Sequence, residues 1–246
     1  MVKTAALRTA LVLLFIRAEL HAQELLPLRH VVVFNNNGRK PPTPNVYPLF
    51  RLSEPFALVE NFYTPATLDA TLTDNLARSR MLYIGQYCDE GPLFADPVVC
   101  KVLRNFLQGG GMIFFDYNTG GRPGRFSPDT EKFLTSVGVM PPSEFCQGYG
   151  SDCFAEANRH AVLSAPVPIG GKEAGHYGWW EKWPKEQIVL AHAKDDPGKA
   201  TLLIQEGIHG KGVVMFNQLP GAFRSADGLY FDLVRNIIAY AYNEAR

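Results

Sequence analysis

Short apolar runs alternate with amphipathic segments along most of this chain, and that alternation limits its fold more than any other feature. The runs VVVF (31–34), MLYI (81–84) and MIFF (112–115) present no strongly polar side. Strands that are apolar on both faces are typical of a parallel sheet covered on each side by helices. Amphipathic helices are expected at 96–111 and 226–245. The sequence therefore predicts an α/β fold, with a doubly wound, mainly parallel sheet and helices on both faces.

The C-terminal part predicts a hairpin and a final helix. Residues 200–218 are interpreted as two strands joined by a turn at HGKG, and the 226–245 helix follows them. Residues 141–187 include the glycine-rich stretch CQGYGSDC, and we expect them to form an irregular insertion. No repeat or linker divides the chain, so residues 23–246 are expected to form one domain.

The first 22 residues have the order of a secretory signal. Basic Lys3 and Arg8 precede the apolar run TALVLLFI, and the small residue Ala22 stands before Gln23. The apolar run is too short for a standard membrane span. A buried N-terminal helix and an uncleaved anchor are the alternatives. We therefore expect an exported protein, periplasmic or extracellular, with no stable membrane span once residues 1–22 are removed.

The four cysteines fit an oxidising compartment. Cys146 and Cys153 lie in CQGYGSDC, and Cys88 and Cys100 flank DEGPLFADP. An even count favours two local disulfides, 146–153 and 88–100, although three pairings are possible and free thiols are the alternative. No CxxC or HxxxH spacing occurs in the sequence, so no metal site is predicted.

Charge and glycine spacing exclude two further classes of partner. Lys+Arg and Asp+Glu each number 24, so the net charge is zero and we expect no nucleic-acid partner. The glycines at 109–111 and 120–124 do not match the GxGxxG pattern, so no dinucleotide and no other cofactor is predicted. The sequence does not indicate an oligomeric state.

Polar residues stand at the end of each apolar run, in the stretches FNNN, GQYCDE, FDYNTGG and FNQLPG. Because ligands bind at the carboxyl ends of the strands of a doubly wound sheet, these side chains are expected to form a polar binding edge. The alternative is that each strand simply leaves the core through polar residues. The expected ligand-binding residues are Asn35, Asn36, Gln86, Tyr87, Asp116, Tyr117, Asn118, Asn217 and Gln218.

Three stretches, covering about half of the chain, carry a resemblance to a known superfamily. They are RMLYIGQY, FLQGGGMIFFDYN, and HGKGVVMFNQLPG leading into RNIIAYAY. In these the chain resembles the class I glutamine amidotransferase-like superfamily, which has a flavodoxin-like sheet, and within it the ThuA-like (trehalose-utilisation) proteins and exported bacterial domains of unknown function. Active amidotransferases of this fold place a nucleophilic cysteine in a glycine-flanked turn after a central strand. The matching turn here, FFDYNTGG, has no cysteine, so glutamine amidotransferase activity is not expected.

Other side chains leave several interpretations open. Asp116 with Asp89 or Glu90 could form a carboxylate pair for acid–base chemistry or cation binding, or Asp116 could bond the glycine-rich backbone that follows it. His176 could face the polar edge from the insertion. The aromatic residues around it could stack on sugar rings or fix the insertion to the sheet. These residues are Tyr177, Trp179, Trp180 and Trp183.

Three functions are therefore considered. We expect an exported module without catalytic activity that binds a small polar ligand, such as a carbohydrate, or a partner protein at the polar edge. The second interpretation is a cell-envelope hydrolase that uses the carboxylate of Asp116 with that of Asp89 or Glu90. The third is a domain for subunit assembly, as amidotransferase-like domains are in some glycosidases.

Overall fold

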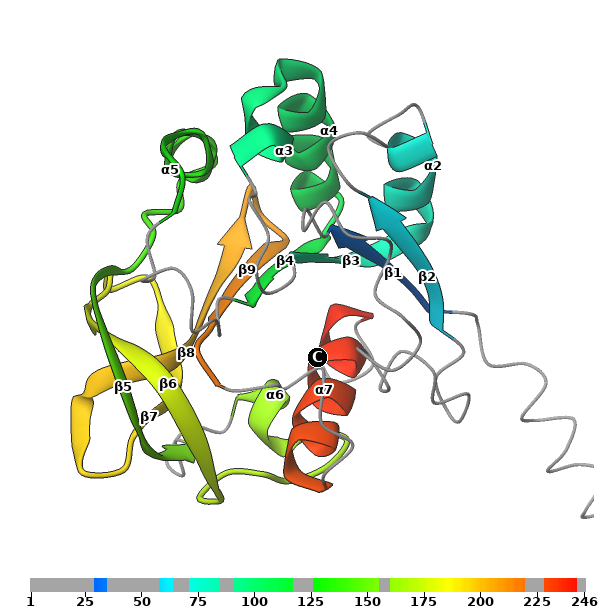
Figure 1. Ribbon diagram of the computed structural model, residues 1–246. Coiled ribbons are helices and arrows are strands. Elements are labelled where there is room, and N and C mark those ends of the chain that lie inside the picture. The colour runs from blue at the N-terminus through cyan, green and yellow to red at the C-terminus, as the bar shows by residue number, and fades with distance from the viewer. Residues whose placement is uncertain are drawn as a thin grey trace, which may run out of the picture.

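The computed structural model of the chain describes seven stretches, which are residues 29–34, 58–63, 71–84, 91–116, 126–154, 160–219 and 228–242. These described residues form a nine-stranded sheet with helices on both faces (Figure 1). The fold is α/β, as predicted. The sheet is mixed, however, so the expectation of a mainly parallel sheet is correct for one half of it only.

The parallel half contains five strands in the spatial order β2 (Leu58–Tyr63), β1 (Arg29–Phe34), β3 (Ser79–Ile84), β4 (Met112–Asp116) and β9 (Gly212–Asn217). Each pairs in parallel with its neighbour. This order is that of flavodoxin-like folds, in which the chain reverses its direction of progress between the first and third strands. The carboxyl ends of β1, β3, β4 and β9 therefore share one edge, where the sequence predicts the polar residues.

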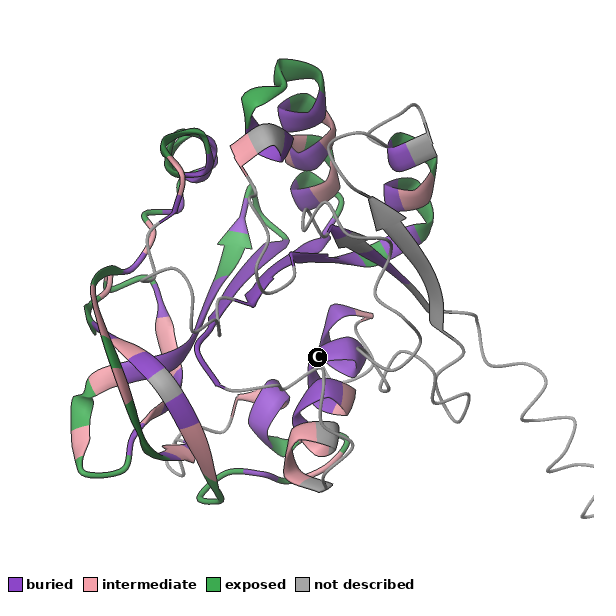
Figure 2. Ribbon diagram, in the orientation of Figure 1, coloured by how far each residue is buried: buried purple, intermediate pink, exposed green. Residues whose placement is uncertain are grey.

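Helices cover each face of the sheet over a separate apolar cluster. One face carries α2 (Thr71–Arg78), α3 (Gly91–Ala95), α4 (Pro97–Gln108) and α5 (Pro128–Ser136). The other carries α6 (Ala161–Ser164) and α7 (Gly228–Ala241). The strands between these layers are buried through most of their length (Figure 2). Among the described helices, none is both long and apolar enough to cross a membrane.

Local chemistry sets the ends of α4. The Asp96 side chain accepts hydrogen bonds from the N–H groups of Val98 and Val99, and Pro97 occupies the first turn, where its missing N–H is not needed. At the other end the glycines allow a tight exit into β4. Gly110 has a φ of 87°, and a Cβ on Gly111 would lie 2.5 Å from the Phe106 ring. These signals confirm the predicted helix.

Four antiparallel strands form the other half of the sheet, which we call the antiparallel annex. They are β5 (Ser143–Phe154), β6 (Glu173–Lys182), β7 (Ile188–Ala193) and β8 (Asp196–Ile208). β5 pairs with β6 and β7, and β8 pairs with both β6 and β7, so these strands close into a ring. β8 and β9 form the predicted hairpin, and α7 is the predicted final helix. The expectation of an irregular insertion at 141–187 is wrong, because this range contains β5 and β6.

Glycines in the annex mark close approach between strands rather than turns. The Trp179 ring of β6 covers Gly148 of β5, where a Cβ would lie 2.4 Å from Cζ3. His176 covers Gly150 in the same way, at 2.5 Å from its Cε1. A missing side chain on one strand is thus filled by a ring from the next. The stretch CQGYGSDC has the composition of a loop but the conformation of a strand.

The cysteines are not paired as predicted. Cys146 and Cys153 lie on the same extended strand, and seven residues at about 3.3 Å each separate them far beyond the roughly 7 Å that a disulfide spans between Cα atoms. Cys100 lies buried in α4, where its Sγ donates to the Phe94 carbonyl oxygen at 3.0 Å. All three are free thiols, so the prediction of 146–153 and 88–100 disulfides is wrong. Cys88 and residues 1–22 lie outside the described residues.

Candidate functional site

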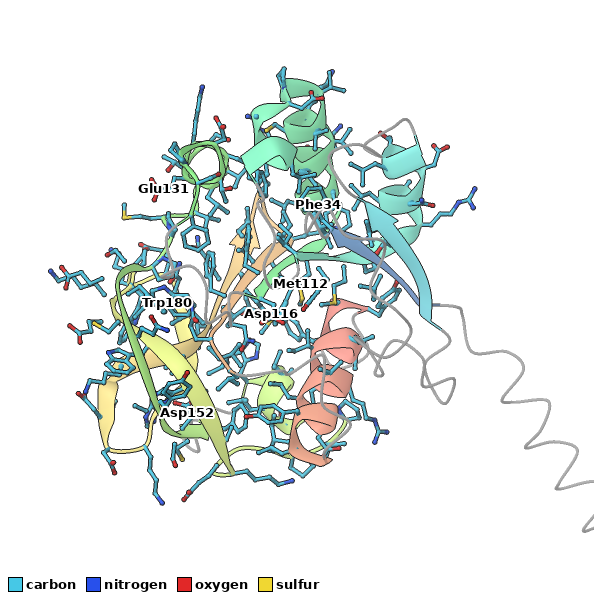
Figure 3. The ribbon with its side chains drawn as sticks, viewed as in Figure 1. Phe34, Met112, Asp116, Glu131, Asp152 and Trp180 are labelled. Atoms are coloured by element: carbon cyan, nitrogen blue, oxygen red, sulfur yellow. The ribbon has the colours of Figure 1, made fainter. Side chains whose placement is uncertain are left out.

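Three polar side chains meet at the carboxyl edge of β3, β4 and β9. The Tyr83 hydroxyl donates to Asp116 Oδ2 at 2.6 Å, and the Asn217 amide donates to Asp116 Oδ1 at 3.0 Å. Strand register explains the meeting, because Asp116 is paired with Asn217 and Tyr83 with Phe114, two residues before Asp116. The carboxylate is 4% exposed. Figure 3 shows Asp116 at the end of β4, near the junction with the annex.

The side chain of Asn217 makes its hydrogen bonds within the fold. Its amide nitrogen also donates to the Leu219 carbonyl oxygen at 3.1 Å, and its Oδ1 accepts from the Leu219 N–H at 3.1 Å. The residue is fully buried, so both amide hydrogens and the oxygen are used internally. Asn217 therefore positions Asp116 and the chain that follows β9, and it has no donor left over for a ligand.

The remaining predicted residues are divided between buried and undescribed positions. Gln218 is 1% exposed, and its Nε2 has no hydrogen-bond partner among the described residues. The structure thus brings Asp116 and Asn217 into contact and places Gln218 next to them. The other predicted residues of the edge follow the ends of β1, β3 and β4 in the sequence but lie outside the described residues. They are Asn35, Asn36, Gln86, Tyr87, Asp89, Glu90, Tyr117 and Asn118.

The Tyr83–Asp116–Asn217 cluster can orient a carboxylate for hydrogen bonding. Each Asp116 oxygen accepts one of these two bonds, and a carboxylate has about four acceptor positions. Within the described ranges no group of three metal-ligating side chains occurs. The arrangement is suited to accepting hydrogen bonds from a hydroxyl or amide group.

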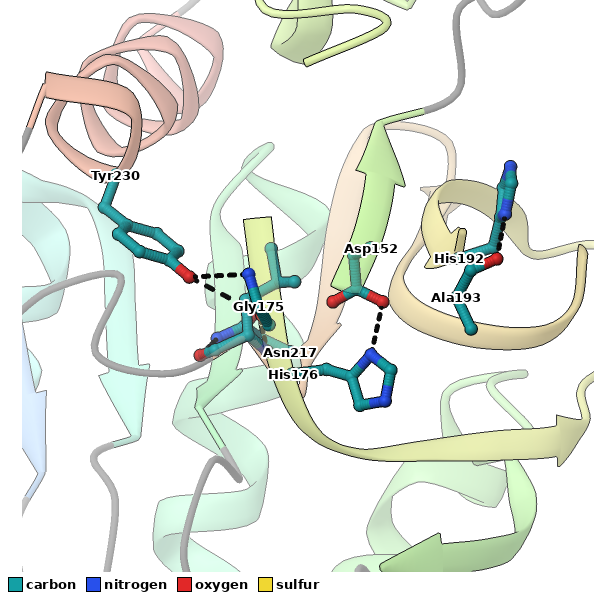
Figure 4. A network of polar contacts seen from close by, with 8 residues as sticks. Asp152, Gly175, His176, His192, Ala193, Asn217 and Tyr230 are labelled. Atoms are coloured by element: carbon teal, nitrogen blue, oxygen red, sulfur yellow. Dashed lines mark hydrogen bonds and ion pairs between the residues drawn. The ribbon is translucent and has the colours of Figure 1, made fainter. Parts of the chain in front are cut away.

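A second polar centre lies in the annex, where His176 of β6 faces Asp152 of β5. His176 Nδ1 and Asp152 Oδ1 are 2.7 Å apart, and the two residues are 5% and 0% exposed (Figure 4). Burial raises the pKa of Asp152 from its ordinary 3.8 to about 6, although His176, Thr201 and His192 each lower it. The Asp152 carboxyl therefore binds and releases its proton closer to neutral pH than an ordinary carboxyl does.

Unpaired polar atoms accumulate around this pair. Asp152 Oδ2 and Thr201 Oγ1 are buried without a hydrogen-bond partner among the described residues, although Thr201 is near enough to lower the pKa of Asp152. The Gln218 N–H donates to the Thr201 carbonyl oxygen at 2.8 Å, so Thr201 lies opposite Gln218 across β8 and β9. The annex centre and the β9 end of the polar edge are therefore neighbours.

Sequence reasoning missed Tyr83, Asp152 and Thr201. Tyr83 lies in an apolar run and stacks on Phe114, with ring centroids 5.9 Å apart, so only its hydroxyl has a polar role. Asp152 lies in CQGYGSDC, which the sequence predicts to be irregular. Alternating positions on β5 and β6, had these been recognised as strands, would have pointed to a pair between Asp152 and His176.

The tryptophans do not form one exposed cluster. Trp180 is fully buried in the core on the α4 side, and Trp183 packs against the same core. Trp179 is partly exposed, and the side chain of Tyr177 lies outside the described part. The interpretation that the aromatic residues fix this region to the sheet is thus correct for Trp180 and Trp183.

Comparisons with known proteins find similarity in structure only. No family model and no curated protein matches the sequence. A ThuA-like protein from Bacteroides uniformis has a TM-score of 0.56 at 11% identity, over 90% of this chain and 94% of the other. A GMP synthase subunit from Thermoplasma acidophilum has a TM-score of 0.50 at 10% identity, over 89% and 96%.

A third similar structure is Gan42B, a GH42 β-galactosidase from G. stearothermophilus, with a TM-score of 0.50 at 12% identity. The match covers 89% of this chain but only 30% of the β-galactosidase chain. The chain therefore has the glutamine amidotransferase-like fold expected from the resemblance. ThuA-like proteins are among those that share it. At these identities the similarity concerns the fold alone.

Proposed function

We propose that this protein is a binding module without catalytic activity, which takes a small hydroxyl-rich ligand, a carbohydrate, at the carboxyl edge of β3, β4 and β9. The observation that carries the proposal is the Asp116 carboxylate, held by Tyr83 at 2.6 Å and by Asn217 at 3.0 Å at this edge. A carboxylate oriented in this way accepts hydrogen bonds from sugar hydroxyl groups.

The edge is also where this type of sheet binds ligands, because chain direction reverses beside β1 and β3. The predicted polar residues at 35–36, 86–87 and 117–118 follow β1, β3 and β4 in the sequence, which supports a polar ligand for this edge. The ThuA-like and β-galactosidase structures with this fold favour a carbohydrate over other polar ligands.

The absence of a cysteine from the sequence FFDYNTGG supports binding rather than amide transfer, because that chemistry needs a thiolate. Export is part of the proposal, and it rests on the signal-like order of residues 1–22. An exported module that binds a sugar without changing it is the function that these observations support best.

Saturation-transfer NMR tests the proposal with trehalose, galactose and glucose as probes. We expect at least one sugar to bind the wild-type protein and to lose binding with Asp116→Asn, measured at a temperature at which thermal melts show both proteins to be folded. Asn217→Asp is not a suitable control, since it alters a buried residue; exposed Lys185→Ala is, because its side chain is 92% exposed. Binding that survives Asp116→Asn would reject this site. Conversion of a bound disaccharide to its monosaccharides would favour the hydrolase instead.

A further inference from the structure

The imidazole of His176 is held at one nitrogen and open at the other. Asp152 Oδ1 fixes Nδ1 at 2.7 Å. Nε2 has no hydrogen-bond partner within the described part of the chain, and the residue is 5% exposed. The ring lies directly over Gly150, where a Cβ would be 2.7 Å from Nε2, so a residue without a side chain is needed at this position. When Asp152 is ionised, Nδ1 keeps its proton and Nε2 is a hydrogen-bond acceptor.

Trp179 lies beside this nitrogen in a fixed orientation. Its ring meets the His176 ring edge-on, with centroids 5.5 Å apart, and rests against Gly148. Its indole N–H donates to Glu181 Oε1 at 3.2 Å. The Lys199 ammonium lies over the ring, 5.0 Å from its centroid. The ring is therefore oriented by its neighbours before any ligand arrives.

The surface around these groups is mixed in character. Tyr149, which stands between Gly148 and Gly150 in β5, is 79% exposed. Glu181 provides an acceptor, and Lys199 provides a donor on a flexible side chain that is 35% exposed. Two aromatic rings with an acid, a base and an imidazole around them form a group of contacts typical of sugar sites, where ring C–H surfaces stack and hydroxyl groups find polar partners.

We propose that His176, Trp179, Tyr149, Glu181 and Lys199 form a second saccharide-binding site on the outer face of the annex. A sugar ring stacks on Trp179 in place of the Lys199 ammonium, which then donates to a sugar hydroxyl. His176 Nε2 accepts from another hydroxyl. The site does not include Asp116, and its residues come from β5, β6 and β8 rather than from β3, β4 and β9.

Isothermal titration calorimetry with maltohexaose, cellohexaose and β-1,4-galactotetraose tests the site. We expect one of these oligosaccharides to bind the wild-type protein, and Trp179→Ala to weaken binding at least about tenfold through lost stacking. Tyr149→Ala should weaken it by a smaller factor. Val98→Ala is the matched control, because Val98 is an apolar residue 69% exposed on α4, far from the annex strands in the sheet order.

The outcome is read against Asp116→Asn, which alters the polar edge only. Binding that persists in Asp116→Asn and is lost in Trp179→Ala supports the annex site. Binding that is lost in Asp116→Asn and retained in Trp179→Ala overturns it and leaves the edge site standing. Failure of all three oligosaccharides to bind the wild-type protein also overturns it. His176→Gln, compared with wild type for melting temperature first, separates a lost contact from a lost fold.

Discussion

The hydroxyl of Tyr83 and the carboxylate of Asp116 are joined by a 2.6 Å hydrogen bond between neighbouring parallel strands. Tyr83 is fully buried, and its ring belongs to the core on the α7 side. A residue that the sequence presents as part of an apolar strand thus carries a hydroxyl that orients the carboxylate of the candidate site.

Tyr83→Phe removes this hydroxyl without changing the shape of the ring. We expect the free energy of unfolding to fall by about 1–3 kcal/mol, because a bond to a charged acceptor is lost in a buried place. Urea denaturation measures the change. In a double-mutant cycle with Asp116→Asn, the two changes should not add; strict additivity would show that the two groups do not interact.

His176→Ala should destabilise the protein more than a comparable change at His192 of β7. Asp152 would lose its partner while fully buried, which we expect to lower the free energy of unfolding by about 2–5 kcal/mol. His192→Ala is the matched control, since His192 is only partly buried and its Nδ1 contacts the Ala193 carbonyl oxygen; its expected effect is below about 1 kcal/mol. Equal losses of unfolding free energy for the two variants in urea titrations would contradict the role of His176 as the partner of Asp152.

Ionisation of Asp152 makes stability depend on pH. Its pKa is about 6 in the folded protein, above its ordinary value of 3.8, so the folded state holds the proton more tightly than the unfolded chain. The stabilising contribution of this group is complete below about pH 4 and is lost as the pH rises through about 6. In calorimetry, the wild-type melting temperature should fall relative to that of Asp152→Asn over this range. A constant difference between the melting temperatures of wild type and Asp152→Asn over this pH range would contradict the raised pKa of Asp152.

Gly148→Ala tests the packing of β6 on β5. The new Cβ would lie 2.4 Å from Trp179 Cζ3, so the ring must move, and we expect a loss of about 1–3 kcal/mol in unfolding free energy. Gly109→Ala is the control, because its Cβ would make ordinary contacts at 3.4 Å and its φ is −73°. Thermal melts of both variants would show the difference, and a Gly148→Ala protein as stable as wild type would refute the close packing.

Thiol labelling tests the state of the cysteines. Cys146 and Cys153 are partly exposed and should react with a maleimide well before Cys100, which is buried and whose thiol pKa is raised chiefly by burial. Burial and the nearby Glu181 also raise the pKa of Cys146, so its labelling should speed up as the pH increases. Labelling of these thiols only after reduction would restore the disulfide interpretation.

Intact mass tests the proposed export, which predicts a chain that starts at Gln23.

The parallel half of the fold is predictable from the sequence because each of its elements has a local signature. Asp96 and Pro97 start α4, three glycines end it, and a wholly apolar strand follows. The shared edge of Asp116 and Asn217, 101 residues apart, also follows from strand ends alone. The inward direction of the Asn217 amide cannot be predicted from the strand ends. It depends on the position of the Leu219 carbonyl group, which is determined by the path of the chain after β9.

The annex is not predictable in the same way. Gly148 and Gly150 are compatible with a strand only because Trp179 and His176 of the next strand cover them. Such pairing depends on residues about 30 positions away and on a bulge between Gln147 and Gly150. The prediction of a 146–153 disulfide was wrong for the same reason. A loop would bring those cysteines together, whereas an extended strand separates them.

Closure of β5, β6, β7 and β8 into a ring has a consequence for how this half of the molecule comes apart. In the described part of the annex each of these strands pairs with at least two others, although β6 meets β8 only at Trp180 and Ala200 and β5 meets β7 only over residues 152–154. Backbone amides of the four strands should therefore exchange with deuterium as one cooperative unit, with nearly equal opening free energies, while the opposite margin at β2 frays independently.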